Sequence, residues 1–316
     1  MEIFSCKNKE LIFESEHDNM KDTVEAAVKQ KISLSNAYLV NADLDKAELT
    51  GANLSGANLS GSSLAHTGLN EADLRGVNIT GTKISFTNFA NSLLNKSNFE
   101  GVSLRAAIFV EANLSDANFK GTEVDHGMFS QAILEGTCLK GAKFISCDFN
   151  EAQFTPPNTK SAANIEKEIS KNLRKGGQSL IPDALGKLIA SYEFLNYLEG
   201  AIFRDCIFND AKLSGADLTK VQFHDCDLSS ANLTCCNLQY VSYRRVNFTG
   251  ADLSYALLNG ATFTDCKFVF PHHVTKLYAT ALENTALAQP NSNVISISAG
   301  GTITIHDEIF DVEEKE

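Results

Sequence analysis

The stretch ADLDKAELTGANLSGANLSG, residues 42–61, repeats one five-residue phrase four times. Each phrase has a small residue, a polar residue, a leucine and two residues that are often Ser-Gly or Thr-Gly. Leucines five apart rotate by about 140° around an α-helix, and they fall on alternate faces of a flat strand. The phrase therefore predicts one short extended side of a coil, with the leucine inward and a corner on its last two residues.

The central hydrophobic residues keep this spacing over most of the chain. They run from Leu34 to Phe154 and again from Leu198 to Phe268. Glycines two residues after a central hydrophobe support the corners, because glycine tolerates unusual backbone dihedrals. These glycines are Gly51, Gly56, Gly61, Gly76, Gly81, Gly101, Gly121, Gly136 and Gly141.

Side chains of one kind recur every 20 residues, which corresponds to four sides in each coil. Both runs together predict about ten coils and, at a strand spacing of about 4.8 Å, a tube about 48 Å long. Asparagines at the outward position repeat at the same interval and predict an amide ladder along stacked strands. The recurring residues are Phe89, Phe109, Phe129 and Phe149 in one column and Asn58, Asn78, Asn98 and Asn118 in the other.

These A(D/N)LXX phrases resemble those of the pentapeptide-repeat family. The resemblance implies an all-β solenoid, a right-handed quadrilateral β-helix, over both runs of phrases. The family has no common catalytic residues, so the resemblance implies no catalytic site in this chain.

The segments outside the repeats predict caps and an insertion, because an open tube exposes strand edges at both ends. A hairpin pairing Ile3 and Phe4 with Leu11–Phe13 and a helix over 18–30 would cover one end. A helix over 271–289 and a hairpin pairing Ile295 with Ile305 would cover the other. The predicted parts are an N-terminal cap (1–31), the first part of the β-helix (32–155), a helical-hairpin insert (156–197), the second part of the β-helix (198–270) and a C-terminal helix, β-hairpin and acidic tail (271–316).

The two runs join in phase if Phe154 occupies side one of a coil and Leu198 resumes on side two. Every column then keeps its character across the insert, with Phe149 followed by Phe208 and Cys147 by Cys206. This phase predicts one uninterrupted tube.

The cysteines and histidines do not predict a metal or redox site. No Cys-x-x-Cys or His-x-x-x-His spacing occurs, and His272 and His273 are interpreted as structural. Cys206 and Cys226 would lie one coil apart, near disulfide distance, but inward packing as reduced thiols is favoured. Five of the eight cysteines take the inward position where alanine usually sits, namely Cys147, Cys206, Cys226, Cys236 and Cys266.

No motif of an enzyme is present: the chain has neither a nucleophile elbow nor a phosphate-binding loop. We therefore expect no enzyme activity and no cofactor. The N-terminus lacks the pattern of a signal peptide and no apolar run is long enough for a transmembrane segment, which favours a cytoplasmic protein. Because the resembled family includes effectors, secretion into a host cell without a cleavable signal peptide stays open.

The charge of the chain disfavours direct nucleic-acid binding, with a net charge of −12 and a pI of about 5.1. The leading hypothesis is a non-enzymatic protein-interaction scaffold of a bacterial pentapeptide-repeat protein, with an effector role as one version of it. The alternative, which the resemblance implies, is a DNA mimic that binds a type II topoisomerase, as in quinolone resistance. That role needs a continuous acidic stripe, whereas the outward column of side three reads Asp43, Ser63, Lys83, Ser103, Glu123, Lys143.

Apolar residues at outward positions are the candidates for binding a protein partner of unknown identity. They lie on the adjacent sides four and one, and either the insert covers them or a partner binds them. A homodimer contact through the C-terminal region is a further expectation. The candidate residues are Leu93, Ile108, Met128, Ile133 and Ile207 on the tube and Tyr192, Phe194 and Tyr197 in the insert.

Overall fold

The computed structural model describes residues 1–154, 198–253, 256–258 and 260–267, together with four strands nearer the C-terminus. The chain divides into two compact units, Met1–Gln153 and Phe154–Glu316, and each is treated by itself. The predicted insert at 156–197 lies outside the described residues.

The first unit begins with an antiparallel hairpin and one helix. Strand β1 (Glu2–Phe4) pairs with β2 (Leu11–Glu14), with Ile3 opposite Phe13. Helix α1 (Met20–Lys29) follows, and its inner face is buried. The side chain before the helix, Asn19, accepts a hydrogen bond from the backbone of the first turn.

These elements satisfy backbone groups of the first coil. In later coils the N–H of each outward residue donates to the preceding coil, as Asn58 does to Ala37. The first coil has no predecessor, and there the N–H of Tyr38 donates to the carbonyl of Phe4 over 2.7 Å. The N–H of Glu48 donates to the Glu25 carboxylate of α1 over 2.9 Å. The hairpin and helix thus replace the missing coil at this edge.

The coils of the first unit form a parallel β-solenoid with four sides, as the sequence predicted. Four successive bridges each join residues that are 20 apart, which is one coil of four five-residue sides. They are Asn53↔Asp73, Asn58↔Asn78, Ser63↔Lys83 and Gly68↔Asn88.

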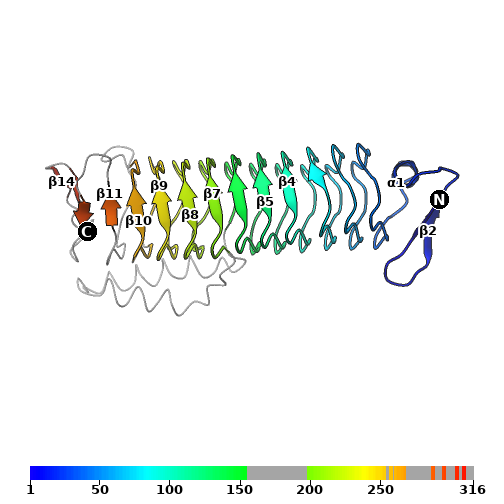
Figure 1. Ribbon diagram of the computed structural model, residues 1–316, viewed down its shortest axis with the longest axis horizontal. Coiled ribbons are helices and arrows are strands. Elements are labelled where there is room, and N and C mark those ends of the chain that lie inside the picture. Colours follow the sequence, from blue (N-terminus) through cyan, green and yellow to red (C-terminus); the bar gives the residue numbers. More distant parts are fainter. Residues whose placement is uncertain are drawn as a thin grey trace, which may run out of the picture. The chain divides into compact units, whose positions relative to one another are not determined.

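Among the described coils, full strands form on the third side from Ile84 onward, and within each unit they stack in parallel (Figure 1). The solenoid has about seven turns, fewer than the predicted about ten coils. Its first coils are paired through single bridges instead of strands, as at Asp43↔Ser63. The strands are β3 (Ile84–Ser85), β4 (Ser103–Arg105), β5 (Glu123–Asp125) and β6 (Lys143–Ile145) in the first unit, and β7 (Ile202–Arg204), β8 (Gln222–His224), β9 (Ser242–Arg244) and β10 (Thr262–Thr264) in the second.

The core of the first unit is a stack of buried side chains from successive coils. The predicted column of Phe89, Phe109, Phe129 and Phe149 is confirmed, with ring centroids 4.8–4.9 Å apart from one coil to the next. Rings of the neighbouring side meet this stack edge-on, as Phe99 does at 5.9 Å from Phe109. Each of these rings is at most 1% exposed.

The corners adopt the left-handed backbone conformation that the glycine spacing predicted. Gly51 has φ 68° and Gly141 has φ 66°. Many other corners reach positive φ without glycine, for example Asn36, Lys96 and Asp116. The repeat therefore tolerates non-glycine corners, with a modest backbone cost at each.

The second unit shows how the chain resumes after residue 154. The N–H of Phe154 donates to the carbonyl of Lys212 over 2.8 Å, the pattern by which Leu34 donates to Asn53. Phe154 therefore takes the place on side one that the phase argument gave it. The continuity of the two runs stays a prediction.

The C-terminal strands differ from the predicted hairpin between Ile295 and Ile305. Strand β12 (Val294–Ser296) pairs with β11 (Ala286–Ala288), and β13 (Ile303–Ile305) pairs with β14 (Glu308–Phe310), all antiparallel. The prediction was wrong because the alternation of Ile residues indicates a strand but does not choose its partner.

The predicted helix over 271–289 is also wrong at β11, which pairs in parallel with β10. The edge of β10 offers unpaired backbone groups, and pairing with it satisfies β11 better than a helical turn would. His272 and His273 lie outside the described residues.

Candidate partner-binding surface

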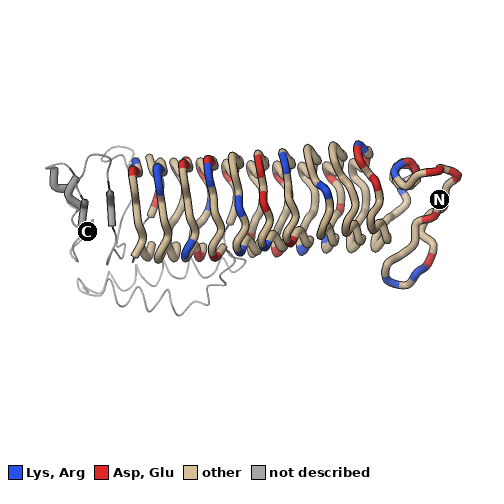
Figure 2. The backbone as a smooth tube through the Cα atoms, viewed as in Figure 1, with Lys and Arg blue, Asp and Glu red and all other residues tan. Residues whose placement is uncertain are grey.

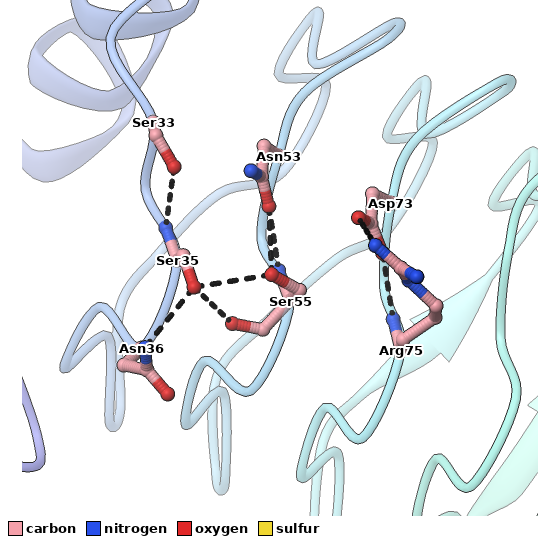
Figure 3. Close-up of polar contacts among 7 residues, drawn as sticks. All are labelled: Ser33, Ser35, Asn36, Asn53, Ser55, Asp73 and Arg75. Atoms are coloured by element: carbon pink, nitrogen blue, oxygen red, sulfur yellow. Dashed lines mark hydrogen bonds and ion pairs between the residues drawn. The ribbon is translucent and has the colours of Figure 1, made fainter.

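Where it is Asn or Asp, the residue before a central hydrophobe closes a turn through its side chain (Figure 3). Asn53 Oδ1 accepts hydrogen bonds from the N–H and the hydroxyl of Ser55, at 3.2 and 2.8 Å. Asp73 likewise accepts from the N–H of Arg75 at 3.2 Å and from its guanidinium at 2.8 and 2.6 Å. The arginine hydrogen bond is the main reason that the pKa of Asp73 lies below its ordinary value.

The same contact explains why the phrase prefers Asn or Asp at this position. An Asn or Asp oxygen reaches the N–H two residues on, whereas a hydrocarbon side chain cannot accept a hydrogen bond. Asparagines in register also bond along the column: Asn78 donates to Asn58 at 3.3 Å and Asn118 to Asn98 at 3.1 Å. These bonds confirm part of the predicted amide ladder.

Several outward positions of the first unit carry other residues, and four of them are aliphatic. These four form what we call the apolar strip: Leu93, Ile108, Met128 and Ile133. Each takes the place of a turn-closing Asn or Asp. Leu93 and Met128 are 42% and 44% exposed, and the two isoleucines are half-buried. Each replacement gives up a hydrogen bond worth about 0.5–1.5 kcal/mol.

The structure brings these predicted residues together in two neighbouring columns. Ile108 pairs directly with Met128 on one side. On the next side Leu93 and Ile133 both pair with Asn113, which lies between them. Ile207, 41% exposed, belongs to the second unit.

The insert residues proposed to join this surface, Tyr192, Phe194 and Tyr197, lie outside the described residues.

Other exposed apolar side chains were not singled out from the sequence. Phe86 is 50% exposed at a corner, where its ring stacks on His66 with centroids 5.0 Å apart. Tyr240 is 66% exposed and Ile145 is 41% exposed. A large side chain at a corner position, where glycine is common, was the available signal for Phe86 and Tyr240.

Charges of both signs are interspersed along the coils (Figure 2). Lys143 Nζ lies 2.7 Å from a Glu123 oxygen and Lys120 Nζ lies 3.0 Å from a Glu100 oxygen. Hydrogen bonds from these lysines lower the pKa of both glutamates. Glu100 and Glu123 are therefore paired with bases one coil away, and they do not belong to an uninterrupted acidic stripe.

The inward cysteines are buried, free thiols, as predicted. A hydrogen bond with the neighbouring Cys206 thiol, together with burial, raises the pKa of Cys226. Burial raises the pKa of Cys266 to about 12. Since the thiolate is the reactive form, these thiols are poor nucleophiles and poor metal ligands.

Two further features were sought in the part of the chain that the structure describes. No three His, Cys, Asp or Glu side chains gather there as metal ligands would. No helix in the same part of the chain, α1 included, is long and apolar enough to span a membrane.

Among solved structures, HetL, a pentapeptide repeat protein involved in heterocyst differentiation regulation from the cyanobacterium Nostoc sp. strain PCC 7120, is 19% identical over 88% of this chain and 100% of its own, with a TM-score of 0.33. QnrB1, a plasmid-mediated fluoroquinolone resistance protein, is 18% identical over 64% and 92%, with a TM-score of 0.34. A pentapeptide repeat protein from the Arabidopsis thaliana thylakoid lumen is 21% identical over 38% and 74%, with a TM-score of 0.24.

No curated protein sequence matches the chain. Two family models match it and together cover more than half of its residues. The model for pentapeptide repeats matches residues 30–65, 57–95, 83–121, 97–136 and 128–155, and the model for a pentapeptide repeat region matches residues 198–269. The chain therefore belongs to the pentapeptide repeat family.

Proposed function

We propose that this chain is a non-enzymatic protein-interaction scaffold whose binding face includes the apolar strip. The observation that carries the proposal is that four nearby outward positions carry exposed or half-buried hydrocarbon side chains where Asn or Asp would close a turn. A solenoid built from short, similar coils presents a rigid face on which such side chains keep fixed spacing.

Asn or Asp in the same column is compatible with the fold. In the column of Ile108 and Met128, the preceding coil carries Asn88 and the following coil carries Asp148. Both of these close their turns, with Oδ1 accepting an N–H at 3.0 and 2.9 Å. Because the central residues beneath remain fully buried phenylalanines, Asn or Asp would fit the column equally well. We infer that the apolar residues are kept for a partner.

The partner that suits this strip is a protein with a complementary aliphatic surface, because desolvating exposed Leu, Ile and Met side chains is the gain available there. A bacterial scaffold that works in the cytoplasm, or that is delivered as an effector, is the version of this proposal that we favour; the resemblance of the repeats supports it.

The test compares partner capture by three proteins. The double variant I108N/M128N restores two turn-closing side chains and removes half of the strip. The variant I145N is the matched control. Ile145 is 41% exposed, close to Met128 at 44%, but it lies on the third side. A partner captured by the parent and by I145N, but lost with I108N/M128N, supports the proposal. A partner that binds all three equally contradicts it.

The DNA-mimic alternative is separated by a gyrase supercoiling assay. Potent inhibition that survives I108N/M128N would favour topoisomerase binding through acidic faces. The paired charges described above do not support that reading, since a mimic of DNA needs unneutralised acid along the rod.

A further inference from the structure

Three basic side chains stand in one column on the third side of the second unit. Arg204 of β7 is in register with His224 of β8, and His224 is in register with Arg244 of β9. Each follows a buried aromatic residue, and both arginines are exposed while His224 is half-buried. At a strand spacing of about 4.8 Å the column spans about 10 Å. We call these three residues the basic column.

Two basic residues on the third side of the first unit, Lys143 and Arg105, have acidic partners one coil away. Lys143 faces Glu123 at 2.7 Å, and Arg105 Nε lies 4.0 Å from an oxygen of Asp125. Among the described residues, Arg204 and Arg244 have no acidic partner of this kind. The residue in register with both of them is His224. The two arginines stand on the outward face of the strands, whereas Asp205 and Asp225 lie at the corner positions that follow Arg204 and His224.

Asp225, which follows His224 in the chain, is already engaged. Both carboxylate oxygens of Asp225 accept from the guanidinium of Arg245, with Nη2 at 2.6 Å. The pKa of His224 is lowered, first by burial and then by Arg204, Arg244 and Arg245, with Asp225 acting in the opposite direction. Protonation of the imidazole is therefore disfavoured in the free protein, and an anionic ligand beside it would act in the opposite direction.

The outward faces of the three strands carry no carboxylate. Besides the basic column, their outward residues are Ile202, Gln222 and Ser242. The imidazole Nε2 lies 3.4 Å from Gln222 Oε1. The face thus offers mainly donors to a ligand, and arginine forks match carboxylate geometry.

We propose that the basic column binds an acidic α-helix of a partner protein, with carboxylates one helical turn apart facing Arg204, His224 and Arg244. A helix rises about 5.4 Å per turn, whereas neighbouring strands are about 4.8 Å apart. The row of carboxylates and the row of basic side chains therefore become misaligned by about 1.2 Å over the column. Arginine side chains accommodate that drift. Same-face carboxylates of an extended peptide are about 6.6 Å apart and would drift by about 3.6 Å.

This proposal uses different residues from the apolar strip and is tested separately. Carboxylates opposite His224 favour its protonated form, so the helix binds more tightly as the pH falls from about 8 to about 6. In the free protein that protonation is opposed by Arg204, Arg244 and Arg245.

The probe is a fluorescent synthetic helix with Glu at positions i, i+4 and i+7, measured by anisotropy with the full chain at low salt. We expect R204Q/R244Q to weaken binding about tenfold. The control R105Q, in which a paired arginine is lost from the first unit, should bind as the parent does. H224Q should still bind the probe at about pH 8, but its affinity should not rise when the pH is lowered to about 6.

Two results would contradict the proposal. One is a scrambled helix of the same composition, with its glutamates spread around the helix, that binds as tightly as the probe. The other is inorganic phosphate that displaces the probe at concentrations matching the probe's own affinity, which would mark a small-anion site. Circular dichroism of R204Q/R244Q confirms that lost binding is not lost folding; a folded double variant that binds normally also overturns the proposal.

Discussion

Replacing Phe109 by alanine is the sharpest test of how the coils hold together. The ring of Phe109 is fully buried and stacks on Phe89 and Phe129 at 4.9 and 4.8 Å. It also meets Phe99 and Phe119 edge-on at 5.9 and 6.0 Å. A buried Phe→Ala change costs about 3–5 kcal/mol, and its cost rises where the site cannot collapse. Backbone bonds to both neighbouring coils limit collapse here, so we expect about 4–5 kcal/mol.

The assay is urea unfolding followed by circular dichroism, with hydrogen exchange to localise the change. Phe86→Ala is the control, because Phe86 is 50% exposed and stacks on His66 alone; its loss should cost about 1 kcal/mol. In a solenoid the damage should spread first to the adjacent coils. Equal destabilisation by F109A and F86A would refute the stacked-core account.

Three other expectations follow from single contacts. Gly127→Ala should destabilise the protein by about 1–3 kcal/mol in thermal melts, because an added Cβ would lie 2.7 Å from the Phe129 ring; an unchanged melt contradicts this. Tyr243→Phe should stabilise it by about 1 kcal/mol, because the buried hydroxyl has no hydrogen-bond partner among the described residues; lower stability would reveal a partner. Because Arg75 holds the pKa of Asp73 low, that pair stabilises the fold above the ordinary carboxyl pKa and the contribution is lost as the pH falls through the lowered value. Arg75→Gln should raise the pKa of Asp73 in NMR titration, and an unchanged pKa would refute the pairing.

The period of five allowed much of the fold to be predicted, because it fixes which residues face inward. The Phe109 column, the inward cysteines and the glycine corners all follow from position within the phrase. Gly127 did not, because its role depends on how closely the side chains of Phe129 and Val124 approach it, which the phrase does not specify. The pairing of Ile295 with Leu287 was also missed, since alternation indicates a strand without specifying its neighbour.

The apolar strip could be found from the sequence, but its meaning could not. The outward position was expected to be polar simply because it faces water. The structure shows that Asn53 and its equivalents also close a turn, so an apolar residue there gives up a hydrogen bond. The basic column was missed because charge on side three was read at the residues that precede the central hydrophobes of the first run, whereas Arg204, His224 and Arg244 follow the central residues of the second run.

The central claim is that the apolar strip serves binding and not folding, and one measurement tests it most directly. In I108N/M128N two turn-closing hydrogen bonds return, each worth about 0.5–1.5 kcal/mol, while the lost cross-strand contact is worth about 0.2–1 kcal/mol. The thermal midpoint of I108N/M128N should therefore equal or exceed that of the parent. A midpoint several degrees lower would show that Ile108 and Met128 are needed by the fold, and would contradict the account.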